Sequence, residues 1–191
     1  RWLLDDRDAA GSLNLLNSFP PALARRMVAM RLQLKAARLA GQPAKALDTA
    51  LLLAKHRAFS PEAADSLVRG LILDWLSHFH DAEALARWWN QLSPALRAMP
   101  DMVSEAALRF VALGGEGATI RHWLEPLWTP LQKPNGQWTP AQLARMVQAL
   151  ENCLMDVQTA DARQWLARVE GAQQAQPQDA QLQYLAGMVC M

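Results

Sequence analysis

Five prolines recur at near-constant spacing and constrain the fold more than any other feature of this chain. They are Pro21, Pro61, Pro100, Pro140 and Pro177, separated by 40, 39, 40 and 37 residues. Proline is tolerated at the first position of a helix and disfavoured in a helix interior, because it lacks the backbone N–H. Helical sequence lies between these prolines. The spacing therefore predicts a repeated pair of helices, as in tetratricopeptide-like solenoids, whose repeats are about 34 to 47 residues long.

The composition is typical of a helical globular protein. Hydrophobic residues make up 51% of the 191 residues and charged residues 19%, which argues against disorder. Glycine, tyrosine and phenylalanine are sparse, which favours helices over sheets. Nineteen basic residues oppose eighteen acidic ones, and the net charge of +1 gives no reason to expect nucleic acid or an anionic membrane as the main ligand. No apolar stretch approaches the ~20 residues of a membrane span.

We expect an all-α, right-handed solenoid of tetratricopeptide-like hairpins with about nine helices, of which the first and last have no partner. One domain, residues 1–191, contains the whole array, and partial hairpins form both of its ends. The chain starts at Arg1 without a methionine and stops at Met191 within a segment expected to be helical, which indicates part of a longer protein. The expected repeats are roughly 21–59, 60–98, 99–138 and 139–176.

Local signals predict where several helices begin and end. Ser60, Asp81 and Thr139 are expected to be N-caps, since their side-chain oxygens accept hydrogen bonds from the first turn. Gly41 is expected to close a helix in the left-handed conformation. Residues 129–138 contain Pro-Asn-Gly and are expected to form a connecting loop.

No catalytic or metal-binding signature is found in the sequence, so we expect neither an enzyme nor a cofactor. There is no glycine-rich phosphate loop, no His-Glu-x-x-His and no nucleophile elbow. His78 and His80 are two residues apart and would point to different sides of a helix, so they do not form a chelating pair. Cys153 and Cys190 are expected to be buried apolar residues rather than a disulfide.

Large side chains are numerous, with eight tryptophans and eight methionines. Trp88, Trp123 and Trp165 fall in the second helices of successive repeats, where we expect them to fill the space between hairpins. Trp138 lies in the expected loop and is the exception. The methionines either fill gaps in the core, which we favour, or form an adaptable apolar surface.

Basic residues on the predicted first helices form the candidate binding surface. Arg31, Lys35 and Arg38 follow an i, i+4, i+7 pattern and would share one side of a helix. In tetratricopeptide arrays the first helices line the concave face, and a groove lined with arginines suits carboxylates, whether of acidic side chains, a chain terminus or propionate groups. The alternative is that these residues form solvated faces. The candidate residues are Arg31, Lys35, Arg38, Arg69, Arg109 and Arg145.

One segment of the chain resembles a known family. Residues 32–67 resemble the HemY family of proteobacterial membrane proteins, and their sequence is LQLKAARLAGQPAKALDTALLLAKHRAFSPEAADSL. Two further stretches fit the same family, WLLDDRDAAGSLNLLNSFP at 2–20 and GGEGATIRHWLEPLW at 114–128. The resemblance implies tetratricopeptide-like repeats on the cytoplasmic side of the bacterial inner membrane, held by an N-terminal anchor that lies before Arg1. It also implies a role in haem or porphyrin metabolism, and the family offers no catalytic residues to transfer.

These observations lead to one expected function and one alternative. We expect a non-catalytic scaffold that binds proteins or peptides, with haem-pathway enzymes as candidate partners, and that contacts the membrane only through its anchor. The alternative is a haem- or porphyrin-binding carrier, in which histidine or methionine ligates iron and arginine meets the propionates.

Overall fold

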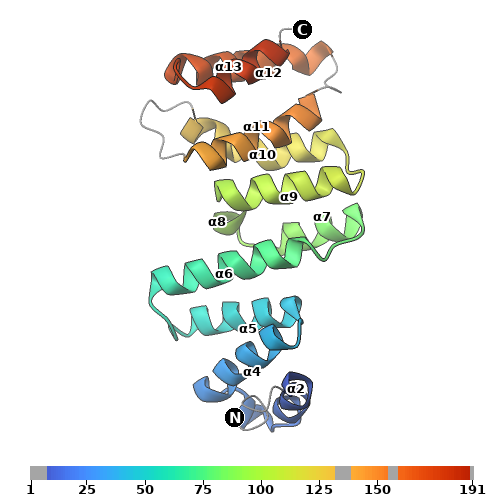
Figure 1. Cartoon of the computed structure of the whole chain (residues 1–191), viewed down its shortest axis with the longest axis vertical. Helices are drawn as coiled ribbons and strands as arrows, with labels where there is room; N and C mark the ends of the chain where they lie inside the picture. Colours follow the sequence, from blue (N-terminus) through green and yellow to red (C-terminus); the bar gives the residue numbers. More distant parts are fainter. Residues whose placement is uncertain (1–7, 132–138, 155–158, 190–191) are drawn as a thin grey trace. The chain divides into compact units, whose positions relative to one another are not determined.

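The computed structural model describes residues 8–131, 139–154 and 159–189 and shows that the chain is all-α, as the sequence predicts. The described residues form twelve helices and no strand (Figure 1). The chain divides into two compact units, Arg1–His78 and Phe79–Met191. One continuous array over residues 1–191 stays a prediction.

The first unit is a succession of helices around a core of leucines and alanines. Helix α4 packs against α2 and α5, and α5 packs against α6. Four alanines of α4 and α5 have no exposed surface, which lets the two helices approach closely. Those alanines are Ala36, Ala37, Ala46 and Ala50. The helices of this unit are α2 (Ala9–Asn17), α3 (Pro21–Ala24), α4 (Met27–Leu39), α5 (Pro43–Lys55) and α6 (Pro61–Leu76).

The second unit repeats one packing pattern. Helix α9 packs against α10 and α11, α11 packs against α13, and α10 packs against α12, so that alternate helices along the chain also lie side by side (Figure 1). The helices of this unit are α7 (Ala82–Gln91), α8 (Pro94–Arg97), α9 (Pro100–Ala112), α10 (Gly117–Leu131), α11 (Pro140–Leu154), α12 (Thr159–Ala175) and α13 (Ala180–Val189).

Aromatic side chains form much of the core of the second unit. Trp123 of α10 lies between Trp89 and Phe110, with ring centroids at 5.5 and 4.8 Å, and Trp128 contacts Trp165 of α12 at 5.5 Å. These are tilted or edge-on arrangements, which the aromatic quadrupole favours. The packing role predicted for Trp123 and Trp165 is confirmed, since both are buried, and Trp88 is half-buried.

The predicted caps are present. The hydroxyl of Ser60 accepts from the backbone N–H of Ala63, and the carboxylate of Asp81 accepts from that of Ala84. Thr139 and Gln142 form a reciprocal capping box at the start of α11. As predicted, Pro61, Pro100 and Pro140 are the first residues of α6, α9 and α11.

Two of the five prolines do not open the helix that the sequence predicts. Pro21 begins the single turn α3, and the long helix α4 starts at Met27 after an extended residue, Arg26. Pro177 precedes α13, because the carboxylate of Asp179 accepts from the N–H groups of residues 181 and 182 and sets the start at residue 180.

The predicted number of helices and the predicted bounds of the loop are also wrong. The described residues contain twelve helices instead of about nine, and two of the additional ones are the single turns α3 and α8, each opened by a proline. Residues 129–131 belong to α10 rather than to the expected loop, and the remainder of that loop, with Trp138, lies outside the described residues.

Left-handed residues close three helices. Gly41 has φ of 63° and Gly114 has φ of 77°, while Arg57 adopts φ of 53° after α5. Beyond each of them, a backbone N–H bonds to a carbonyl five residues earlier, which is the Schellman pattern. The predicted role of Gly41 is confirmed.

We expect Gly41→Ala to lower the free energy of unfolding by about 1 kcal/mol, because a Cβ atom strains the left-handed conformation. A Cβ at Gly41 meets no atom within 4 Å, so the cost is in the backbone alone. The matched control is Gly70→Ala in the interior of α6, also in open space, which should raise the free energy of unfolding by roughly 0.5–1 kcal/mol. Urea denaturation followed by circular dichroism measures both, and shifts of the same sign would contradict this account.

Candidate functional site

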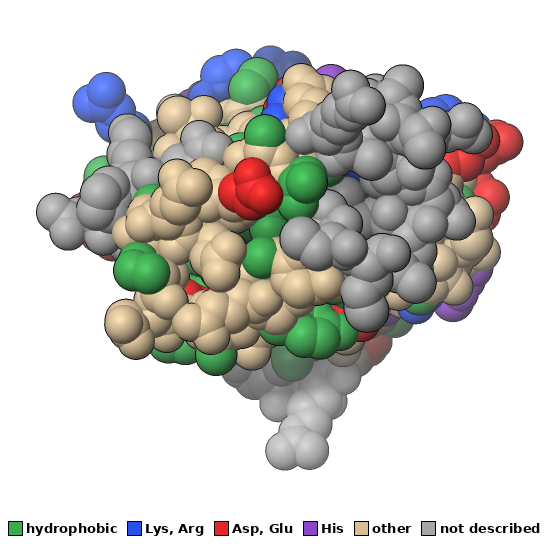
Figure 2. All heavy atoms as spheres, turned by 90° about the horizontal axis from the view of Figure 1, so that it is seen from above, with side chains coloured by type: hydrophobic (Ala, Val, Ile, Leu, Met, Phe, Trp, Pro, Cys, Tyr) green, Lys and Arg blue, Asp and Glu red, His purple; other side chains and the backbone are tan. Residues whose placement is uncertain are grey.

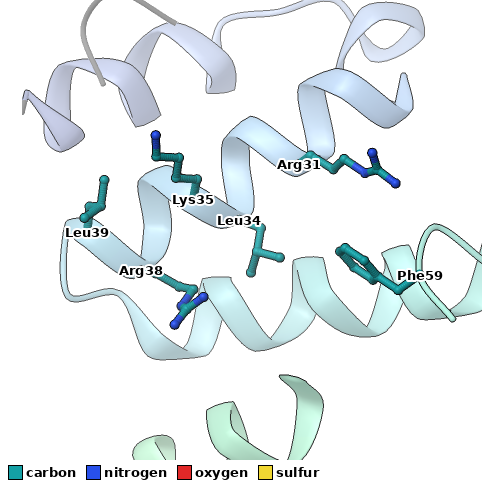
Figure 3. A pocket seen from close by; sticks show the side chains of 6 residues that line it. All are labelled: Arg31, Leu34, Lys35, Arg38, Leu39 and Phe59. Carbon is teal, nitrogen blue, oxygen red and sulfur yellow. The ribbon is translucent and has the colours of Figure 1, made fainter. Parts of the chain in front are cut away.

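The candidate site is an open pocket of about 750 Å³ on the outward side of α4 (Figure 3). Residues 31, 34, 35, 38 and 39 of α4 line it, and this spacing places their side chains along one side of the helix. Phe59, from the segment after α5, closes one end. The lining residues are Arg31, Leu34, Lys35, Arg38, Leu39 and Phe59.

The pocket combines an apolar floor with a basic rim. Leu34 is 7% exposed and forms the floor, whereas Leu39 is 58% exposed at the far end from Phe59 (Figure 3). Figure 3 shows Leu34 and Arg38 pointing from α4 toward α5, and Lys35 pointing away from them. Basic and apolar side chains therefore alternate along the pocket.

Arg31 is held in place by the protein. Its Nη2 donates to the carbonyl oxygen of Ala58 at 2.6 Å, and its guanidinium carbon lies 5.5 Å from the centroid of the Phe59 ring. The carbonyl bond and the cation–π contact fix the side chain at one end of the pocket. Arg31 thus contributes positive charge with little loss of side-chain entropy on binding.

Lys35 and Arg38 are exposed and make no hydrogen bond or ion pair with any residue that the structure describes. Arg38 also lines a second hollow of about 520 Å³ beside the α4–α5 turn, where Asp74 is the carboxylate among the lining residues. Two cations of the pocket are therefore available to an external anion.

The other predicted groove residues lie elsewhere. Arg69 is a half-buried residue of α6 and does not line the α4 pocket. Arg109 of α9 donates to the carbonyl oxygen of Phe79, and Arg145 of α11 pairs with Glu105 at 2.8 Å. The structure brings together Arg31, Lys35 and Arg38, while Arg109 and Arg145 link segments of the second unit. A binding role for all six stays a prediction.

Sequence reasoning missed three pocket residues, Leu34, Leu39 and Phe59. Leu39 is four residues after Lys35, so an exposed leucine on the basic side of the helix was the available signal. Phe59 precedes the Ser60 cap, and nothing local shows that the chain there returns to α4. Arg121 was also missed; it donates to the carbonyl oxygen of Cys153 at 2.5 Å, near the end of α11.

A further hollow of about 400 Å³ lies in the second unit. Its floor is formed by Trp89 and Trp123, which are only 1% and 6% exposed. Its carboxylate, Glu125, accepts from Arg168 at 2.9 Å and lies 3.8 Å from His122. The carboxylate of this hollow is paired within the protein, and Arg97 is the one Lys or Arg among the described lining residues, against three in the α4 pocket, which is therefore the stronger candidate for an anionic ligand.

The surface around α13 has a different character. Helix α13 contains no charged residue, and Figure 2, which views this end of the chain, shows mainly uncharged side chains over the described atoms. Tyr184 is 51% exposed there, and its hydroxyl donates to Glu151 at 2.7 Å. That bond raises the pKa of Tyr184, so the phenol stays neutral at physiological pH.

Two kinds of reactive group can be assessed in the described residues, metal-binding clusters and free thiols. No group of three or more His, Cys, Asp and Glu side chains within them is placed to hold a metal ion. Cys153 is a free, fully buried thiol, and burial raises its pKa to about 12. A thiol with this pKa is protonated at neutral pH and is a poor nucleophile.

The fold and the site define an all-helical protein of packed helix pairs with a basic-rimmed apolar pocket. No helix of its described part combines the length and the apolar character needed to cross a bilayer. Comparison with protein-family models, with curated proteins and with solved structures finds no match to this chain. The HemY resemblance of residues 32–67 stays a prediction.

We expect Cys153 to react slowly with thiol reagents. In a Cys190→Ser background, labelling by Ellman's reagent at pH 8 should be at least ~100-fold slower in the native protein than in denaturant, because burial blocks access and suppresses the thiolate. Since burial raises the pKa of Cys153 in the folded state to about 12, above the ordinary value of 9.0, the thiol is favoured in the folded state, and stability falls as pH rises above about 9. Equal labelling rates in the two states would contradict this, and Cys153→Ser in the same background gives the blank.

Proposed function

We propose that the chain is a non-catalytic helical-repeat scaffold, a right-handed solenoid of tetratricopeptide-like hairpins that binds other proteins. The packing of the second unit carries this proposal. Helices α9, α11 and α13 pack on one another in turn while α10 packs on α12, as expected when successive helix pairs stack. The prolines that open α6, α9 and α11 are separated by 39 and 40 residues, which supports a repeat of that length.

The resemblance to the HemY family supports a choice of partners. If it holds, the partners are haem-pathway enzymes, and the array is held at the bacterial inner membrane by an anchor before Arg1. The chemistry of the α4 pocket suits this role, because protein interfaces commonly combine apolar anchors with arginine.

The scaffold is favoured over a haem carrier by the lining of the α4 pocket. The described residues that line it include no His, Cys, Met or Tyr, the side chains that ligate haem iron. Arginine and lysine alone would hold propionates without fixing the metal. A scaffold requires only a surface that binds a partner protein, and the α4 pocket offers such a surface.

The test is direct binding to purified late enzymes of haem biosynthesis. The immobilised 191-residue protein is expected to bind at least one of them saturably, with a Kd of about 1–100 μM, the range of a transient interface. Biolayer interferometry measures this, and bovine serum albumin serves as the control analyte.

Haem is titrated in parallel and followed by its Soret band. Binding of no enzyme, together with a saturable one-to-one Soret change that a single His→Ala variant abolishes, would establish the carrier instead. Enzyme binding with no such Soret change supports the scaffold.

A further inference from the structure

We propose that the α4 pocket docks an acidic protein segment in which one or two large apolar side chains are flanked by carboxylates. This inference rests on the proposed scaffold function and names the surface and the chemistry of its partner. The apolar side chain would lie on Leu34 and Leu39, and the carboxylates would meet the basic rim.

Charge is the first argument. Residues 9–47 contain six Lys and Arg residues and no Asp or Glu. The unit Arg1–His78 has eleven basic and seven acidic residues, a formal charge of +4, whereas Phe79–Met191 has eight and eleven, a formal charge of −3. The net charge of the whole chain, +1, does not reveal this difference between the two units. An acidic partner is therefore attracted to the first unit in particular.

The apolar floor is the second argument. Leu34 lies between Arg31 and Arg38 along α4, Leu39 follows Arg38 at the far end, and Phe59 closes the end near Arg31 (Figure 3). A volume of about 750 Å³ is ample for one or two large side chains. A purely anionic ligand would leave this apolar surface in water. We therefore expect the partner to bring an apolar side chain as well as carboxylates.

Preorganisation is the third argument. Arg31 is fixed by Ala58 and Phe59, while Lys35 and Arg38 make no hydrogen bond or ion pair in the described part of the chain. A carboxylate that reaches Arg38 can form a bidentate pair without breaking an existing one. Binding thus breaks no pair that the structure describes for Lys35 or Arg38, and the side chain of Arg31 is already ordered before the partner arrives.

The same observations favour a protein over a lipid surface. Helices that lie on membranes present a broad apolar face to the acyl chains. The apolar side of α4 is instead buried inside its own unit, where Met30 is 3% exposed and Ala36 and Ala37 have no exposed surface. Val28 and Leu39 are the large hydrophobic residues that α4 exposes, too few for stable insertion.

The experiment uses fluorescence anisotropy with a short labelled peptide that carries paired leucines flanked by glutamates. We expect saturable binding that weakens as salt rises, and at least a ~tenfold loss for the Glu→Gln peptide and for the Leu→Ala peptide. The double variant Lys35→Glu/Arg38→Glu should lose affinity by at least ~tenfold, and Leu39→Ser by about threefold or more.

The matched control is Lys55→Glu. Lys55 is exposed, belongs to the same unit and does not line the pocket, so its variant should bind within ~twofold of the unmodified protein. Circular dichroism checks that each variant is folded. Equal losses for Lys55→Glu and Lys35→Glu/Arg38→Glu, or equal binding of the glutamate and glutamine peptides, would overturn the proposal.

A parallel arm uses vesicles of phosphatidylglycerol and phosphatidylcholine. Vesicle binding that Lys35→Glu/Arg38→Glu abolishes, with no peptide binding, would replace the acidic segment by an anionic membrane. Enzyme binding that survives Lys35→Glu/Arg38→Glu would overturn this docking site and leave the scaffold standing. Peptide binding at the pocket with no enzyme bound would leave the docking site and remove the haem-pathway partners.

Discussion

The close packing of α4 on α5 is the constraint on which the candidate site depends. Four fully buried alanines, two on each helix, leave no room for larger side chains between the two backbones. Met30, Leu34, Ala36 and Ala37 are the buried residues of α4, and Arg31, Lys35 and Arg38 are left exposed. The packing of α4 on α5 also brings the chain after α5 back to α4, which places Phe59 at the end of the pocket.

Arginine side chains provide a second kind of link in both units. Arg31 bonds to Ala58, Arg109 to Phe79 and Arg121 to Cys153, in each case to a backbone carbonyl 27 to 32 residues away. Carbonyls near the ends of helices lack intrahelical partners, and a guanidinium satisfies them while complementing the helix dipole. Arg109 and Arg121 therefore stabilise the packing of their own unit. Arg31 does the same and also lines the candidate binding pocket.

Much of the fold could be predicted from the sequence, because helix starts and ends are local. Short local patterns mark the helix starts at Ser60-Pro61 and Thr139-Pro140 and the helix end at Gly41. The helix starts predicted at Pro21 and Pro177 were wrong, because a proline also fits a single helical turn or a turn before an N-cap. The long helices start after Arg26 and after Asp179 instead. For the site, helical periodicity brought Arg31, Lys35 and Arg38 together. Phe59 and the partners of Arg109 and Arg145 depend on contacts between segments distant in sequence, which periodicity does not encode.

The central proposal is that a protein segment with acidic and apolar side chains binds along α4. The most direct measurement is a titration of the ¹⁵N-labelled protein with the glutamate–leucine peptide, followed by amide chemical shifts. We expect the largest changes along residues 31–39 and at Phe59, with small changes in Phe79–Met191. Changes concentrated in Phe79–Met191, or no change at saturating peptide, would contradict the account.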